Sequence, residues 1–239
     1  APGVAPHHRV VVQALVRNVS VRTEIDIAYE WEQHRSGGPR PILGVTGTDG
    51  KTTTTMIAAA LLRGGGRTVG EVGNTDLPFM GEIDAPHDVF VVECSSFRLQ
   101  FTTVFRCESS VWLNIAPDHL DWHSNYQKYF DAKAKMWANC LSTDVVVAPI
   151  DDVNICAVAR ASAARVVTFG AVDGDYRVVG NELCGPSGSI MNIARMKRSM
   201  PHDVTNALAA AAVCIEGGLA SAEHVAHALE HFENAPHRI

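Results

Sequence analysis

The sequence lacks the features that would assign it to a membrane or to a secreted protein. No apolar run approaches the roughly 20 residues that a membrane-spanning helix needs. Residues 1–9 contain no apolar core of the kind found in secretion signals. The six cysteines are scattered and form no Cys-x-x-Cys pair, a pattern that predicts buried free thiols in a reducing compartment. We therefore expect a cytoplasmic protein without membrane insertion.

Positive charge is also scarce. Lys and Arg number 20 against 26 Asp and Glu, so the formal net charge is −6 at pH 7. This balance argues against nonspecific nucleic-acid binding, although it leaves room for a local phosphate site. With 46% apolar and 19% charged residues, the composition is that of an ordinary globular protein. The 239 residues allow one large domain or two small ones at about 150 residues per domain.

The apolar pattern predicts strands that alternate with helices. Short apolar runs typical of buried strands lie at residues 41–46, 89–92, 110–115, 144–148 and 165–169. Helical patterns lie at residues 10–17, 52–62, 127–140, 204–215 and 221–232. This alternation predicts an α/β fold with a mostly parallel sheet flanked by helices. Residues 175–200 differ, because a Gly-Pro-Ser-Gly turn separates short apolar segments, and they predict a small antiparallel β excursion.

The strongest chemical signal is the glycine-rich run at residues 44–53, which reads Gly-Val-Thr-Gly-Thr-Asp-Gly-Lys-Thr-Thr. Between a strand and a helix, such a loop lets backbone N–H groups surround phosphates, while its lysine supplies a positive charge. In this interpretation Lys51 contacts phosphate and the Thr52 hydroxyl binds Mg²⁺. The strict phosphate-loop pattern fails at its first glycine, where Val45 stands. A glycine-rich turn that merely joins strand to helix is the alternative.

Further polar groups follow later strands of the predicted sheet. Glu93 ends the strand at 89–92, where a carboxylate facing a phosphate loop can hold Mg²⁺, or be a solvated rim residue. His119 and His123 lie with two aspartates after the next strand and suggest a metal cluster or a polar loop. A zinc-protease site is disfavoured, because no Glu follows His119. Lys133 is either buried with a partner or modification, or extends along the surface.

The start of the predicted helix at 204–215 carries a further polar pair. His202 and Asn206 are four residues apart and so share a helix face. The Asn206 side chain can bond the edge of a nucleotide base. Asp203 beside them is compatible with a plain N-cap.

Together and in this order, the motifs resemble the ATP-binding central domain of the Mur ligases, which is similar to P-loop nucleoside triphosphatases. The motifs are GTxGKTTT, ExSSF, LNIxPDHLDxH, YxxAK and HxxxNAxAA, over residues 41–215. The resemblance implies an ADP-forming ligase of peptidoglycan assembly that joins a muramoyl carboxylate to an amino acid. The Ser-Ser-Phe at 95–97 resembles the motif of those members that add D-glutamate to UDP-N-acetylmuramoyl-L-alanine, so the resemblance implies these two substrates. We also expect a monomer.

The resemblance also implies a domain division. Residues 1–36 are expected to be the tail of an N-terminal UDP-binding domain with its linker, and residues 37–232 the central ATP-binding domain. Residues 233–239 would begin the hinge to a third domain. The absence of an initiator Met and of a closing element at the end indicates a piece of a longer protein.

Site residues carry over by their motif positions. ATP phosphates are expected on the loop of Gly47, Thr48, Asp49, Gly50, Lys51, Thr52 and Thr53. One Mg²⁺ would be held by Thr52 and Glu93, and a second by His119 and a carbamate formed on Lys133. Asn74 matches a contact to the UDP-sugar, Asn206 a contact to adenine, and Arg238 a nucleotide contact at the hinge. Lys51, Glu93, His119 and Lys133 are thus the predicted catalytic residues.

Several positions depart from the family pattern. Asp49 and Asp203 stand where the family has Asn, and Arg98 where it has Gln. Thr75-Asp76 and Met200 also differ from the residues usual at those positions. These departures leave open a nucleotide-binding homologue with impaired catalysis. Another ligase of the superfamily, such as a folylpolyglutamate synthetase, is a further alternative, but the Ser-Ser-Phe at 95–97 argues against it.

Overall fold

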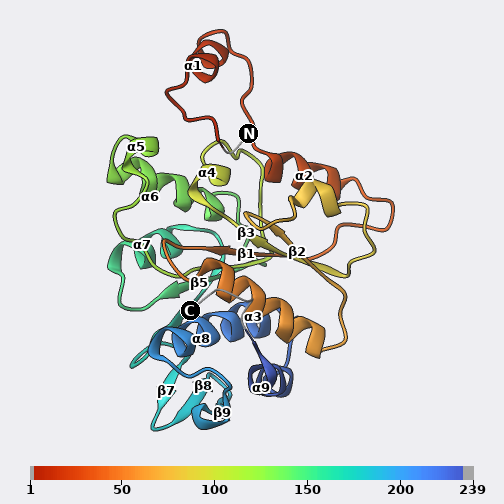
Figure 1. Ribbon diagram of the computed structural model, residues 1–239, viewed down its shortest axis with the longest axis vertical. Coiled ribbons are helices and arrows are strands. Elements are labelled where there is room, and N and C mark those ends of the chain that lie inside the picture. Colours follow the sequence, from red (N-terminus) through yellow and green to blue (C-terminus); the bar gives the residue numbers. More distant parts are fainter. Residues whose placement is uncertain (1–2, 234–239) are drawn as a thin grey trace.

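A six-stranded parallel sheet forms the centre of the molecule in the computed structural model, which describes residues 3–233 (Figure 1). The strand order is β2-β3-β1-β4-β5-β6. The strands are β1 (Ile42–Thr46), β2 (Val69–Gly73), β3 (Val89–Glu93), β4 (Ser109–Trp112), β5 (Val145–Pro149) and β6 (Arg165–Phe169). Strands β1, β3 and β4 are buried along their whole length, as expected when helices cover both faces of a parallel sheet.

Each face of the sheet has its own apolar core. One core lies under α3 (Lys51–Gly64), α8 (Pro201–Glu216) and α9 (Ala222–His231). The other lies under α2 (Glu24–Gln33), α4 (Ser96–Leu99) and α7 (Val153–Ala161), together with the segment that follows α6 (Tyr126–Ala134). Figure 1 shows the sheet between these two groups of helices. The predicted fold class, a mostly parallel sheet flanked by helices, is confirmed.

The expected antiparallel excursion is confirmed as a separate three-stranded sheet at the lower end of Figure 1. It consists of β7 (Arg177–Val179), β8 (Glu182–Gly185) and β9 (Gly188–Asn192). This sheet packs beside α8 and α9, and Leu183 and Met191 complete the core beneath them. The excursion therefore lies at the far end of the molecule from α4 and α6.

Four elements differ from the expectations. Strand β2 and helix α2 are absent from the sequence prediction, because the two glycines of β2 and the mixed charges of α2 weaken the apolar pattern. The helix expected over 127–140 ends at Ala134 and continues as a 3-10 turn at Lys135–Trp137. The short helix α5 (Leu120–His123) lies where no helix was evident.

The first helix, α1 (Arg9–Val16), projects from the top of the molecule (Figure 1). All six cysteines are free, and five of them are buried. Among residues 3–233, no helix is long and apolar enough to cross a membrane.

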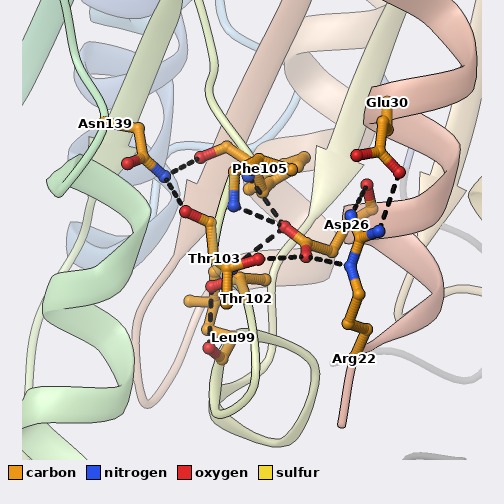
Figure 2. A network of polar contacts seen from close by, with 9 residues as sticks. Arg22, Asp26, Glu30, Leu99, Thr102, Thr103, Phe105 and Asn139 are labelled. Carbon is orange, nitrogen blue, oxygen red and sulfur yellow. Dashed lines mark hydrogen bonds and ion pairs between the residues drawn. The ribbon is translucent and has the colours of Figure 1, made fainter. Parts of the chain in front are cut away.

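Helix α2 is anchored by the buried carboxylate of Asp26 (Figure 2). Its Oδ1 accepts the backbone N–H groups of Thr103, Val104 and Phe105 at 3.1, 2.9 and 2.8 Å. Its Oδ2 accepts from the Thr103 hydroxyl and from the Arg22 guanidinium, both at 2.9 Å. Burial alone would raise the pKa of Asp26, but these hydrogen bonds leave it below its ordinary value of 3.8. The carboxylate thus fixes α2 to the loop before β4.

We predict that Asp26→Asn destabilises the fold by about 2–4 kcal/mol, because the amide satisfies fewer donors and leaves Arg22 without its buried partner. The lowered pKa means that the ionised carboxylate stabilises the wild type at neutral pH. This stabilisation is lost as the pH falls through the folded-state pKa, below 3.8. Urea unfolding between neutral and acidic pH measures both effects.

Glu30→Gln is the matched control, because Glu30 binds the same arginine at 2.7 Å but is about half exposed. It should change the unfolding free energy by less than about 0.5 kcal/mol. Equal losses in the two variants, or an unchanged acid dependence in Asp26→Asn, would contradict this account of the anchor.

Candidate active site

The glycine-rich loop joins the end of β1 to the start of α3 at the carboxyl edge of the sheet. Gly50 is in the left-handed region, with φ 79°, and a Cβ there would lie 2.6 Å from Oδ1 of Asn206. No side chain caps α3, so the first N–H groups of the helix remain available to an anion. Asn114 holds the loop, since its Oδ1 accepts from the backbone N–H groups of Thr48 and Asp49 at 3.0 and 2.9 Å.

Two lysines converge on one carbonyl of this loop. The Gly47 oxygen accepts from Lys51 Nζ at 3.0 Å and from Lys133 Nζ at 2.6 Å. Lys133 is 1% exposed, so of the two alternatives left open by the sequence the buried one is correct. Burial, together with the Lys51 charge, lowers the pKa of Lys133 to about 7, and burial also lowers the pKa of Lys51. The pair forms a positive, partly desolvated centre suited to an anion.

Glu93 ends β3 beside this centre and is 2% exposed. Its Oε1 accepts from Asn74 Nδ2 at 3.0 Å, so the structure brings two predicted site residues into contact. Its Oε2 is buried and has no hydrogen-bond partner among residues 3–233. A buried carboxylate oxygen without a donor is costly and fits a bound cation. Gly73, at φ 101°, lets the chain turn here, because a Cβ would lie 2.5 Å from the Glu93 carbonyl.

His119 lies one loop further along the same edge, exposed and in the left-handed conformation with φ 52°. Its ring packs against Tyr129, at 6.2 Å between centroids, and Lys133 Nζ lies 4.8 Å from the centroid of that same Tyr129 ring. His119 and Lys133 thus flank one side chain. His123 is buried and its Nε2 lies 3.0 Å from Ser96 Oγ. Among the described residues, no cluster of three metal-ligating side chains is present.

The predicted base contact lies at the start of α8. Asn206 is buried against Gly50 of the loop, so the structure joins these two distant motifs. Asp203 is not the N-cap, which is Met200. Oδ1 of Asp203 lies 3.3 Å from Nε of Arg198, whereas its buried Oδ2 has no partner.

The remaining predicted residues lie in the first turn of α3, on the exposed part of the loop, or elsewhere in the chain. Thr52 and Thr53 lie in the first turn of α3, and the Asp49 side chain is exposed. Arg98, one of the departures, pairs with Glu24 at 2.6 Å and ties α4 to α2. Arg238 lies outside the described residues.

Sequence reasoning assigned no role to two residues that shape the site. Asn114 clamps the loop as described, and Tyr129 places its hydroxyl 3.0 Å from Thr48 Oγ1. Both stand within motifs already noted, at 113–123 and 129–133, which was the available signal. Their contacts span 65 and 81 residues of sequence, so only the fold shows them.

Known proteins resemble this chain in sequence and in fold. The model of the Mur ligase middle domain matches residues 45–214. A UDP-N-acetylmuramoylalanine–D-glutamate ligase of Frankia casuarinae is 34% identical over 252 residues, covering all of this chain and 51% of that protein. The enzyme of the same name from Streptococcus mutans serotype c is 32% identical over 244 residues, covering all of this chain and 52% of that protein. The chain spans about half the length of these curated relatives.

Among solved structures, MurF from Acinetobacter baumannii superposes with a TM-score of 0.70 at 20% identity. The match covers 89% of this chain and 49% of that chain, and it supports the fold. Since the family model extends over most of the chain and includes the glycine-rich loop from residue 45 onward, the chain belongs to the Mur ligase family by its middle domain.

Proposed function

We propose that this chain is the nucleotide-binding part of an ATP-dependent ligase that joins D-glutamate to UDP-N-acetylmuramoyl-L-alanine. The observation that carries the proposal is the convergence of Lys51 and Lys133 on the Gly47 carbonyl, beside the uncapped start of α3. The names of relatives at 32% and 34% identity support these substrates. The division at 1–36, 37–232 and 233–239 is part of this proposal. Because the chain spans about half the length of those relatives, further domains of the enzyme would lie outside it.

In the proposed reaction, the substrate carboxylate attacks the γ-phosphorus of ATP and ADP leaves, which produces an acyl phosphate. The amino group of D-glutamate then attacks the acyl carbon, forms the amide and releases phosphate. Catalysis of such a transfer depends on positioning and charge neutralisation. Lys51 and the N–H groups of the loop at 47–53 would hold the phosphates, while Asn206 would contact adenine. Asn74, bonded to Glu93, would orient the sugar nucleotide.

The unpartnered oxygen of Glu93 fits a divalent cation, which Thr52 would also bind. His119 and a carbamate on Lys133 would hold a second one. Bound Mg²⁺ would neutralise charge on the transferred phosphoryl group. The carbamate is reasonable for Lys133, because its lowered pKa leaves much of the amine uncharged. The free amine adds to CO₂, forms an N–C bond and loses one proton, so a neutral buried amine becomes an oxygen-rich anion.

We predict that the chain of 239 residues binds Mg-ATP weakly and forms no amide, since it spans only about half the length of the relatives that it matches. Calorimetry with Mg-ATP should show binding that Lys51→Met weakens by about tenfold or more. Lys197→Met serves as a control, because this lysine is half exposed and pairs with Glu233. Equal affinity in wild type and Lys51→Met would refute the phosphate site, and amide formation by this chain would refute the need for further domains.

Lys133→Met should abolish the carbamate signal in ¹³C NMR with labelled bicarbonate, and should abolish ligation by the complete enzyme. Lys135→Met is a matched control on the same segment, since Lys135 Nζ donates to the Gln100 carbonyl at 2.5 Å. It should keep both the signal and the activity. A Lys133→Met enzyme with unaltered activity would exclude the proposed role of this lysine.

Asp49→Asn should tighten Mg-ATP binding, because the substitution removes a negative charge beside the phosphates at nearly constant shape. A unit-charge repulsion at ~5 Å and an effective dielectric of ~20 has an upper limit of about 3 kcal/mol. The side chain is exposed, so we expect a gain of only about threefold in calorimetry. Equal or weaker binding would contradict the repulsion and would remove the main argument for an impaired homologue.

A further inference from the structure

The Ser-Ser-Phe segment that follows Glu93 has no role in the proposed reaction. Ser95 caps α4, since its side chain accepts from the Arg98 N–H at 3.4 Å. Ser96 is buried and contacts His123 Nε2 at 3.0 Å. Phe97 is half-buried and lies among aromatic rings of the next loop. The segment therefore connects the end of β3 to the polar loop after β4.

Three rings of the α5 region pack around Phe97. The ring centroids of His119 and Trp122 lie 4.6 and 4.7 Å from that of Phe97. The His123 ring stacks nearly parallel to Phe97, with 5.8 Å between centroids and an interplanar angle of 10°. Trp122 and His123 belong to α5, and His119 is the left-handed residue that precedes it. The start of α5 thus packs on one phenylalanine.

From this packing we infer that Phe97 is a positioning residue, which holds the His119 imidazole in place. The inference deepens the proposed function, because His119 is a predicted metal ligand. Phe97 lies four residues after Glu93, the other predicted side-chain ligand next to a strand end, and it packs against His119 in the loop after β4. Phe97 therefore joins the segment that follows Glu93 to the loop that carries His119.

The backbone at His119 explains why such support is needed. A non-glycine residue with φ 52° is in a conformation that L-residues adopt at a cost. Asp118 accepts the His119 N–H at 2.8 Å, and the His119 carbonyl accepts from Trp122 and His123. The His119 imidazole itself is half exposed, and its Nε2 lies 3.3 Å from Oδ2 of Asp118. Phe97 and the more distant Tyr129 are the rings that pack against it.

The first test uses the 239-residue chain without nucleotide or metal. In NMR spectra, the ring protons of His119 should be displaced by the ring current of Phe97, and His119→Asn assigns them. Phe97→Leu should move them toward random-coil shifts, whereas Phe97→Tyr should leave them near the wild-type values. Unchanged His119 shifts in Phe97→Leu would overturn the inference, whatever the reaction of the complete enzyme.

The second test measures Mn²⁺ binding by the same chain with a non-hydrolysable ATP analogue, using the electron paramagnetic resonance signal of free Mn²⁺. Phe97→Leu should weaken Mn²⁺ binding by about tenfold. Phe97→Tyr, which keeps an aromatic ring at this position, should bind Mn²⁺ with nearly the wild-type affinity. Binding of the analogue in EDTA should stay within about twofold of wild type, because Phe97 is not among the predicted nucleotide contacts.

Phe79→Leu is the matched control, since Phe79 packs on Phe90 at 4.7 Å in the core away from the loop at 118–124. It should lower stability without changing Mn²⁺ affinity. Equal loss of Mn²⁺ binding in Phe79→Leu and Phe97→Leu would show a merely structural effect and would overturn the inference. Absence of metal and nucleotide binding in the wild type would instead contradict the proposed function, and the NMR test would still decide the inference.

Discussion

The carbonyl oxygen of Gly47 is the point on which the arrangement of the candidate site depends. It accepts from Lys51 in α3 and from Lys133 in α6, so helices on opposite faces of the sheet meet at one atom. Two ammonium groups next to each other are unfavourable unless one loses its proton or an anion arrives. The lowered pKa values of both lysines express this constraint. The two lysines therefore make the loop favourable for binding an anion.

Two buried carboxylates show how the same chemical group serves structure in one place and function in another. Asp26 has every oxygen occupied by donors from the loop at 103–105 and from Arg22, and it anchors α2 (Figure 2). Glu93 is equally buried, yet one of its oxygens has no donor. A fully bonded carboxylate contributes to stability, whereas an incompletely bonded one stores a cost that a cation can relieve. Burial alone would not have separated the two.

Much of the fold was predictable, because five of the six parallel strands are short apolar runs and the glycine-rich loop stands between a strand and a helix. Strand β2 was not, since Gly70 is required by the ring of Phe90, which lies 2.6 Å from where a Cβ would be. At the site, motif spacing indicated Lys51, Glu93 and Lys133. The clamp by Asn114 is a tertiary contact between separate loops, and such contacts leave no periodic pattern in a sequence.

The missing side chain of Gly50 limits which sequences this architecture accepts. Oδ1 of Asn206 occupies the space that a Cβ at residue 50 would need. A side chain at residue 50 would force that amide group out of its place, and the left-handed φ of 79° would strain any residue other than glycine there. The contact between the loop and the start of α8, which joins residues 156 positions apart along the chain, therefore depends on a glycine at position 50.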